Sequence, residues 1–385
     1  MNLMRTLFSP VVPLLLGATL AFRPAAAADE LVLFGTHRSG PGTGFSVGRF
    51  NPATGELTRT AFVCEAEAPS FFVVHPDGKH LYACNSIETF QGKPEGSISA
   101  YALDPASGRL TLLDRKPSGG GEPCYISLDR TGRYALAANY SGGSICVYAL
   151  RPDGSLGERT AWVQQTGRSV NPERQTRAYA HCILTDPDNR FALAADLGAD
   201  KIFVYHFNAS NGSLTPNDPP SVPLKPGSGP RHITFHPNGR FVYVINELAG
   251  TVTAFDWDSA KGTLAEFQTI STLPSNFNGQ NTAAEVEVHP NGKCLYATNR
   301  GDDSIAVFAI DAKSGRLTRV GRVPTRGRMP RFFTLDPTGK WLLLLNHDSD
   351  NAIVFRVEEG TGLLTQTGTP VQVPNPFCAR FLSPP

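Results

Sequence analysis

The segment PRHITFHPNGRFVYVINE, from Pro230 to Glu247, decides the fold, because the chain repeats its pattern six times. Each copy has a His-Pro or Asp-Pro pair or its equivalent, then a glycine turn, then an apolar run that ends in Asn or Asp. The pairs begin at His75, Asp129, Asp186, His236, His289 and Asp336, and ten residues after each stand Asn85, Asn139, Asp196, Asn246, Asn299 and Asn346. Successive copies lie 47 to 57 residues apart. This period is typical of the blades of a β-propeller and too long for helical repeats of about 34 residues.

Each repeat predicts four short antiparallel strands. Runs rich in β-branched and aromatic residues lie on both sides of the first turn, at Ile233 to Phe235 and at Phe241 to Ile245. A second hairpin follows, with Thr251 to Phe255 as its first strand and a turn at Gly262. No segment keeps a helical period of 3.6 residues over three turns.

The second hairpin occurs once more often than the first. Its turn glycines are Gly55, Gly108, Gly154, Gly212, Gly262, Gly315 and Gly362, which makes seven copies against six. The missing first hairpin is split between the chain ends, because Leu31 to Phe34 matches its second strand and Pro376 to Leu382 matches its first. We therefore predict an all-β, seven-bladed propeller of four-stranded antiparallel blades, closed by pairing of the C-terminal and N-terminal strands.

The composition agrees with one turn-rich β domain. The chain holds 37 Gly and 31 Pro, yet 41% of its residues are hydrophobic, which is too many for a disordered protein. A net charge of +1, without a clustered run of Lys or Arg, argues against a nucleic-acid partner. The oligomeric state stays open.

The first 28 residues have the pattern of a secretory signal peptide. Arg5 precedes an apolar stretch from Leu7 to Phe22, and alanines fill positions 25–28, as at a cleavage site. An uncleaved anchor is disfavoured because the apolar run is short and contains Pro10 and Pro13. We predict a signal peptide at 1–28 and a single propeller domain at 29–385. We expect an exported protein, periplasmic or secreted, with no membrane contact in its mature form.

The cysteines predict buried thiols. They are Cys64, Cys84, Cys124, Cys146, Cys182, Cys294 and Cys378, and none forms a CxxC pair. Most lie inside predicted strands. In an exported protein a disulfide is the alternative, and the sequence does not choose a pairing.

The candidate site comes from two repeat positions that share one mouth of the central channel. One lies five residues before the His-Pro or Asp-Pro pair, and the other follows the second strand. In four consecutive blades these positions hold His181, Arg231 with Glu247, Arg300, and Arg331 with His347, while His37 comes from the split blade. The expanded loops 157–180, 271–283 and 86–96 lead to the same face. Such a set predicts a site for an anion, although each residue alone could be a solvated side chain.

The chain resembles the seven-bladed propeller lactonases from about Leu31 to Leu382. The motifs are AHCILTDP around His181, GPRHITFHPNGRFVYVINE with Arg231 and Glu247, and AEVEVHPNGKCLYATNRGDDSI with Arg300. The best known activity of this family is 6-phosphogluconolactonase, and it includes fungal carboxymuconate cyclases. The resemblance implies an active site of His, Arg, Glu and Arg at these four places. One feature departs from the family pattern: the phosphorylated lactone is a cytosolic substrate, whereas this chain carries an export signal.

We expect a metal-independent lactonase without a cofactor that opens a sugar lactone. Because arginines dominate the ring of mouth residues, we expect this lactone to be anionic. His181 or Glu247 would transfer protons, and Arg231 and Arg300 would bind the oxyanion and a phosphate or carboxylate. Arg331, His347 and His37 would be further substrate contacts. The alternatives are a carboxymuconate-type lactonizing cyclase and a non-catalytic binding or scaffold propeller. The repeated His75, His236 and His289 are expected in turns, because Asp takes the same position in other repeats.

Overall fold

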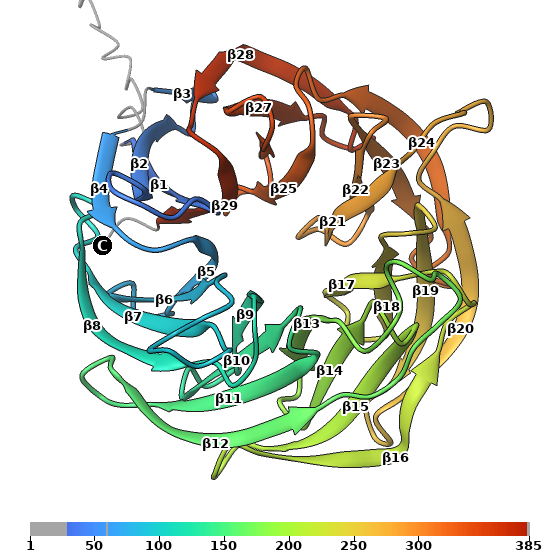
Figure 1. The fold of residues 1–385 in the computed structure, drawn as a ribbon. Coiled ribbons are helices and arrows are strands. Elements are labelled where there is room, and N and C mark those ends of the chain that lie inside the picture. The colour runs from blue at the N-terminus through green and yellow to red at the C-terminus, as the bar shows by residue number, and fades with distance from the viewer. Residues whose placement is uncertain (1–28, 59–60, 383–385) are drawn as a thin grey trace, which may run out of the picture.

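The structure is a computed structural model that describes residues 29–58 and 61–382. Within these residues it contains 29 strands and no helix, and therefore no helix that could cross a membrane. The strands form seven antiparallel sheets arranged around a central axis (Figure 1). The predicted seven-bladed propeller is confirmed. The predicted signal peptide lies outside the described residues and stays a prediction.

Six blades have four strands each, in sequence order from the axis outward. Their strands are β5 (Pro69–Val74), β6 (His80–Asn85), β7 (Ser97–Leu103) and β8 (Leu110–Pro117); β9 (Pro123–Leu128), β10 (Tyr134–Asn139), β11 (Ser144–Leu150) and β12 (Leu156–Gln164); β13 (Ala180–Thr185), β14 (Phe191–Asp196), β15 (Lys201–Asn208) and β16 (Ser213–Pro223); β17 (Pro230–Phe235), β18 (Phe241–Asn246), β19 (Thr251–Asp258) and β20 (Thr263–Ser271); β21 (Thr282–Val288), β22 (Cys294–Arg300), β23 (Ser304–Ile310) and β24 (Leu317–Pro324); and β25 (Pro330–Leu335), β26 (Trp341–Asn346), β27 (Asn351–Val357) and β28 (Leu364–Gln372).

The seventh blade joins the two ends of the chain. Its inner strand is β29 (Pro376–Leu382), which pairs with β1 (Glu30–Thr36) from Leu31 opposite Leu382 to Thr36 opposite Pro376. Next comes β2 (Gly44–Asn51), and both β3 (Glu56–Leu57) and β4 (Ala61–Glu65) pair with it. The outer edge of this blade is therefore made of two short strands where the other blades have one.

The repeated residues of the sequence tie neighbouring blades together. Nε2 of His75, His236 and His289 lies 2.8–2.9 Å from a carbonyl oxygen in the corresponding turn of the next blade, at Gly132, Gly292 and Gly339. At the opposite ends of the second strands, buried Asn side chains bind the adjoining loops; Asn85, for example, donates to the carbonyl of Glu67. The expected turn role of the three histidines is confirmed.

A β-bulge sits near the start of the inner strand in every blade. In six blades the extra residue lies between the paired positions, and it is Ser70, Cys124, His181, Arg231, Arg331 or Phe377. In the remaining blade Ala284 and Glu285 together oppose Thr298. A bulged residue leaves the regular alternation of side chains. The bulge therefore frees this position from sheet packing and turns it toward the channel mouth.

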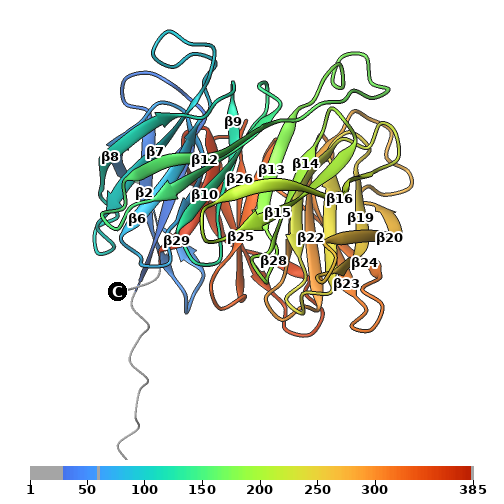
Figure 2. The ribbon, with the colours of Figure 1, turned by 90° about the horizontal axis from the view of Figure 1, so that it is seen from below.

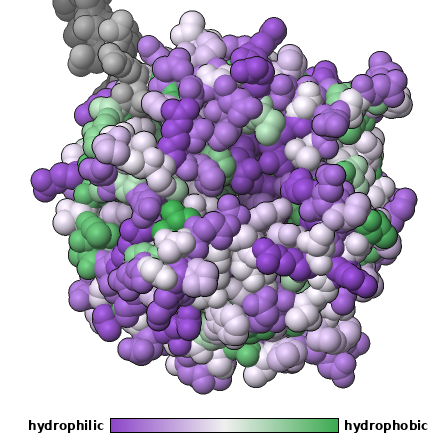
Figure 3. All heavy atoms as spheres, in the orientation of Figure 1, coloured by the Kyte–Doolittle hydropathy of each residue, from purple (hydrophilic) through white to green (hydrophobic). Residues whose placement is uncertain are grey.

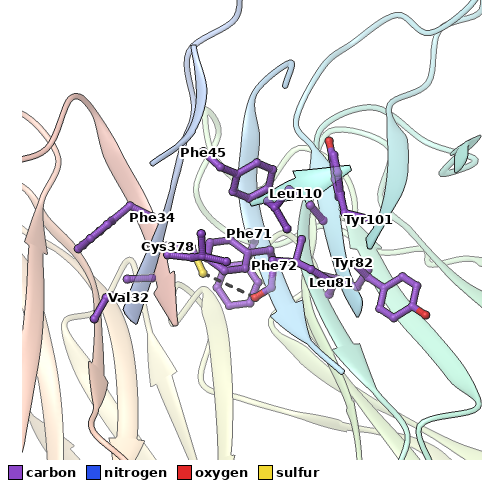
Figure 4. Close-up of a cluster of buried hydrophobic side chains, with 14 of the residues drawn as sticks. Val32, Phe34, Phe45, Phe71, Phe72, Leu81, Tyr82, Tyr101, Leu110 and Cys378 are labelled. Carbon is purple, nitrogen blue, oxygen red and sulfur yellow. Dashed lines mark hydrogen bonds between the residues drawn. The ribbon is translucent and has the colours of Figure 1, made fainter. Parts of the chain in front are cut away.

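The blades pack through buried apolar side chains. Figure 4 shows Phe45 of β2 and Cys378 of β29 beside Phe71 and Phe72 of β5, and the ring centroids of Phe45 and Phe72 are 5.4 Å apart, so the closing blade packs directly on its neighbour. The turn glycines pack equally closely: a side-chain carbon at Gly262, which has φ of +67°, would collide with the ring of Phe191 in the preceding blade. All seven cysteines are free thiols and five are buried, as expected from their positions in strands.

The long loops gather on one face. Loops 86–96, 165–179 and 272–281 connect to the mouth ends of the strands, and they rise together at the top of Figure 2. The His and Asp turns lie at the other end of the inner strands. Any site built by these loops and the bulged residues is thus confined to one mouth of the channel.

Removal of β29, by ending the chain after Asn375, should abolish cooperative folding. The strand pairs with β1 along its whole length and buries Phe377, Cys378, Ala379 and Leu382. Its loss would also leave a sheet edge at the axis, and the total stability of a domain is only about 5–15 kcal/mol. Thermal melting followed by circular dichroism measures this, with a chain that ends at Leu382 as the control. An unchanged melting temperature after truncation at Asn375 would contradict the closure.

Candidate active site

The mouth that carries the loops holds a hydrophilic pocket of about 370 Å³. Figure 3 shows a hydrophilic hollow at the centre of the ring on this face. Seven blades contribute through bulged residues, second-strand ends and loops. The lining residues are His37, Ser86, Glu122, Cys124, Tyr140, Arg174, His181, Glu247, Thr282, Arg300, Met329, Arg331 and Phe377.

Glu247 is the centre of an ion-pair cluster beneath this pocket. It follows β18 and is only 4% exposed. Its Oε2 lies 3.2 Å from Nε of Arg231 and 2.8 Å from Nη2 of Arg300, and its Oε1 lies 2.7 Å from Nη2 of Arg174. Burial opposes ionisation of this carboxyl, but Arg300 and Arg231 outweigh it and hold its pKa well below the usual range. Glu247 is therefore a fixed anion and a weak base.

Two of the arginines are also fixed by backbone carbonyls. Arg231 donates from Nη1 to the carbonyl of Ala284 at 2.7 Å, and Arg300 donates from Nη2 to that of Ala283 at 3.0 Å. Both acceptors belong to β21. The cluster thus spans the blades of β17–β20 and β21–β24, and it presents rigid guanidinium groups at their junction.

His181 is held in the neutral form. Burial, followed by the charge of Arg231, lowers its pKa well below the usual value. Its Nδ1 lies 3.8 Å from Sγ of Cys124, whose thiol also contacts the carbonyls of Ala180 and His181 at 3.7 and 3.6 Å. If the thiol donates to these carbonyls, sulfur accepts from Nδ1–H, and Nε2 is left as the basic nitrogen. Among the described residues nothing hydrogen-bonds Nε2.

The guanidinium of Arg331 has no counter-ion within residues 29–58 and 61–382. It lies over the ring of Phe377, 4.0 Å from the centroid, and the described residues give it neither a hydrogen bond nor an ion pair. Burial, then Arg231 and Arg300, lowers its pKa well below the usual value. The imidazole of His37 also stacks on the ring of Phe377, with the centroids 4.5 Å apart. Burial and the charge of Arg331 lower the pKa of His37 to about 4. The strongest unmet electrostatic demand of the pocket is thus an anion beside Arg331.

The structure brings the predicted site residues together, but not all of them face the pocket. His181, Glu247, Arg300, Arg331 and His37 line it. Arg231 lies behind Glu247, and His347 lies behind Phe377, with the ring centroids 4.9 Å apart. His347 is itself bonded to Asp348 and Asn375. These two act on the pocket through their neighbours.

Comparison with known proteins agrees with this geometry. Residues 31–381 match the family "Lactonase, 7-bladed beta-propeller". The chain belongs to this family. It is 34% identical over 348 residues to a 6-phosphogluconolactonase of Bacillus subtilis, which covers 90% of this chain and 97% of the relative.

Two solved structures are similar along nearly the whole chain. A putative 6-phosphogluconolactonase of Bacteroides fragilis has 35% identity and a TM-score of 0.84, covering 94% of this chain and 100% of that one. The periplasmic gluconolactonase of Pseudomonas aeruginosa has 34% identity and a TM-score of 0.86, covering 93% and 100%. These relatives are consistent with a lactone as the small-molecule ligand of the family.

Two charged pocket residues, Arg174 and Glu122, escaped sequence reasoning. Arg174 comes from the expanded loop 165–179, and it donates to both Glu247 and the hydroxyl of Tyr140, the latter at 3.1 Å. Glu122 precedes β9 with φ of +49°, and burial and Glu88 raise its pKa. The length of the loop was the one available signal for Arg174, because that loop is longer than the equivalent loops of the other repeats. Glu122 stands at a position where the repeats carry no common residue type.

The described residues contain one group of His, Cys, Asp or Glu spaced closely enough to hold a metal ion, and it lies outside the pocket. It consists of His75, Asp77 and His80 in and after the turn between β5 and β6. Its atoms already bond one another, with His80 Nδ1 2.7 Å from Asp77. Both nitrogens of His75 are also engaged, by Gly132 and by the backbone of Asp77. The turn itself accounts for the cluster.

Replacement of Glu247 by Gln should destabilise the fold. It would leave buried Arg231 and Arg300 without their counter-charge, at a cost of about 3–5 kcal/mol in the free energy of unfolding. The lowered pKa means that this stabilisation is present above pH 4.5 and is lost only as the pH falls through the lower folded value. Urea unfolding at pH 5 and pH 8 should therefore show similar losses. Exposed Glu158→Gln is the control, and an unchanged midpoint for Glu247→Gln would contradict the cluster.

Proposed function

We propose that the protein is a lactonase that hydrolyses a sugar lactone of the 6-phosphogluconolactone type to the open-chain acid. The observation that carries this proposal is the unpaired guanidinium of Arg331, in one pocket with the neutral imidazole of His181 and the fixed guanidinium of Arg300. Family membership supports the reaction class, and the B. subtilis relative supports the substrate.

The proposed chemistry uses His181 as the proton-transfer group. Its neutral imidazole accepts a proton from water as the oxygen attacks the lactone carbonyl. Guanidinium N–H groups of Arg300 stabilise the oxyanion of the tetrahedral intermediate. The ring C–O bond then breaks, and His181 returns the same proton to the leaving alkoxide. The products are one carboxylic acid and one free hydroxyl, which account for the added water.

Glu247 has a positioning role in this scheme. The sequence left Glu247 and His181 as equal candidates for proton transfer. Three guanidinium groups around the carboxylate make it a poor proton acceptor, whereas burial leaves the imidazole unprotonated at neutral pH. We therefore assign the proton transfers to His181. Glu247 orients the side chains of Arg231, Arg300 and Arg174.

The anionic group of the substrate is assigned to Arg331. A guanidinium without a partner binds a phosphate or carboxylate through paired hydrogen bonds. The rim adds Arg174, while Glu247 is already neutralised by its ion pairs and the other carboxyl of the pocket, Glu122, has a raised pKa. This charge excess favours a phosphorylated or acidic lactone over a neutral one.

We further propose that the protein acts outside the cytoplasm. The signal-peptide pattern of residues 1–28 supports export, and so does the similarity to the periplasmic gluconolactonase of P. aeruginosa. Recovery of protein that begins near Asp29 from the periplasm or medium is the expected result. Full-length protein in the cytosolic fraction would contradict it.

Substrate class is tested with Arg331→Gln on 6-phosphogluconolactone and on gluconolactone, each corrected for spontaneous hydrolysis. Loss of a charged hydrogen-bond donor should lower kcat/KM on the phosphorylated lactone by roughly 10- to 100-fold, and less on the plain one. The control is Arg316→Gln, in an exposed turn. Equal losses on both lactones would move Arg331 from the phosphate to the reacting carbonyl. If the wild type acts only on carboxymuconate, the cyclase is favoured. If it turns over none of these substrates, the binding module is favoured.

His181→Asn should lower kcat by roughly 10² or more, the usual contribution of a positioned acid or base. In the wild type, the protonation of His181 should lower kcat/KM only as the pH falls through the lowered pKa of this residue. This acid limb of the profile should therefore lie well below pH 6.5. An acid limb that persists in the His181→Asn variant, or a variant with normal kcat, would remove His181 from the proton transfer.

A further inference from the structure

A second charged pair lies one layer deeper in the channel, and the proposed chemistry does not use it. His232 and Glu285 are 2% and 7% exposed, and Nδ1 of His232 lies 2.8 Å from Oε1 of Glu285. His232 belongs to β17 and Glu285 to β21. The pair therefore joins the same two blades as the Glu247 cluster above it.

The imidazole of His232 carries Arg231 on its face. Nη1 of Arg231 lies 3.3 Å from Nδ1 and 3.2 Å from Nε2 of His232, and near-equal distances to both ring nitrogens place it over the ring. The plane of the ring is fixed from the side by Glu285. Tyr125 and His181 also pack against it, with centroids 4.9 and 5.2 Å away. A substitution at Glu285 would thus change the position of Arg231 by way of the His232 ring.

We propose that Glu285 and His232 are positioning residues for the reaction of the pocket. Glu285 fixes the ring of His232, and that ring, together with the carbonyl of Ala284, fixes Arg231 against Glu247. The inference rests on the proposed lactonase function, and it adds to it a layer of residues that touch neither substrate nor water nucleophile.

The pair has two protonation states that share the same geometry. Either a protonated Glu285 donates to Nδ1 of a neutral His232, or an ionised Glu285 accepts from Nδ1–H. Oε2 of Glu285 has no hydrogen-bond partner among the described residues, while the backbone N–H of Val286 donates to Oε1 at 3.2 Å and favours the ionised form. Burial raises the pKa of Glu285 to about 7 and lowers that of His232 well below the usual value.

The charged groups around Glu285 act in opposite directions. Arg231 (β17), Arg331 (β25) and Arg380 (β29) favour its ionised form, although burial outweighs them. Glu287, two residues along β21, has a pKa raised to about 8 by burial and by Glu285. The thiols of Cys182 and Cys378 and the phenol of Tyr125, from β13, β29 and β9, are kept neutral by burial. Glu285 is thus the group in this layer that changes charge near neutral pH beside Arg231.

The test compares Glu285→Gln and Glu285→Ala with Glu287→Gln as the matched control. The wild-type profile of kcat/KM should show an inflection near pH 7, which Glu285→Gln removes because the amide cannot ionise. The amide can still donate to Nδ1, so kcat at pH 6 should stay close to wild type. Glu285→Ala releases the ring, and kcat should fall roughly 10-fold or more. Glu287→Gln should keep both kcat and the inflection. Normal kcat in Glu285→Ala, or a retained inflection in Glu285→Gln, would overturn the proposal.

A second arm needs no substrate. A buried carboxyl with a raised pKa stabilises the fold fully below its unfolded pKa, near 4.5, and this contribution is lost as the pH rises through about 7. The melting temperature of Glu285→Gln minus that of the wild type should therefore increase from pH 5 to pH 8. For the exposed Glu158→Gln this difference should not change with pH. A constant difference would overturn the proposal whether or not a lactone is turned over. The trend without turnover on any lactone would instead reject the proposed function alone.

Discussion

Three guanidinium groups from three distant parts of the chain meet at the carboxylate of Glu247. Arg174 comes from a loop, Arg231 from a bulge and Arg300 from the end of a second strand. A buried carboxylate is stable only when its desolvation is offset by fixed partners, so none of these side chains can move independently. The arrangement of the pocket above them, including the place of Arg331, depends on this cluster.

The propeller contributes symmetry, and the site arises where that symmetry is broken. Every blade has a bulge at the same place, but the bulged residue is apolar or uncharged in some blades and His or Arg in others. The framework of paired strands is satisfied by its own backbone hydrogen bonds. The bulged positions can therefore vary in chemistry without disturbing the strand ladder, and Arg231 and Arg331 at two of them concentrate positive charge on one side of the mouth.

Charge is arranged in layers along the channel. Glu247 compensates the arginines nearest the pocket, and Glu285 lies beneath them with His232. Arg331 has no compensating carboxylate among the described residues, and its guanidinium lies over the ring of Phe377. An anionic ligand would complete the upper layer, and a proton on Glu285 adjusts the lower one. The same low-dielectric interior that makes an unpaired charge costly thereby makes the pocket selective for a compensating anion.

Much of the fold was predictable because it is encoded in local repeats. The spacing of His75, Asp129, Asp186, His236, His289 and Asp336, with the excess of turn glycines, is sufficient for seven blades and for closure by β29. The sequence did not indicate that β3 and β4 share the outer edge of the closing blade. Nor did it indicate the bulges, because an extra residue in one strand is visible only against its pairing partner.

The repeats are sufficient to predict which residue types stand at the channel mouth, since equivalent repeat positions must lie on one ring. His181, Arg231, Glu247, Arg300 and Arg331 were found in this way, without coordinates. The role of each of them depends on contacts that the repeats do not encode. Long-range contacts made Glu247 an acceptor of three ion pairs, left Arg331 without one, and placed Arg174 and Glu285 beside them. The position of a residue within the repeat fixes where its backbone lies in the propeller, whereas its charge state depends on burial and on neighbours from other blades.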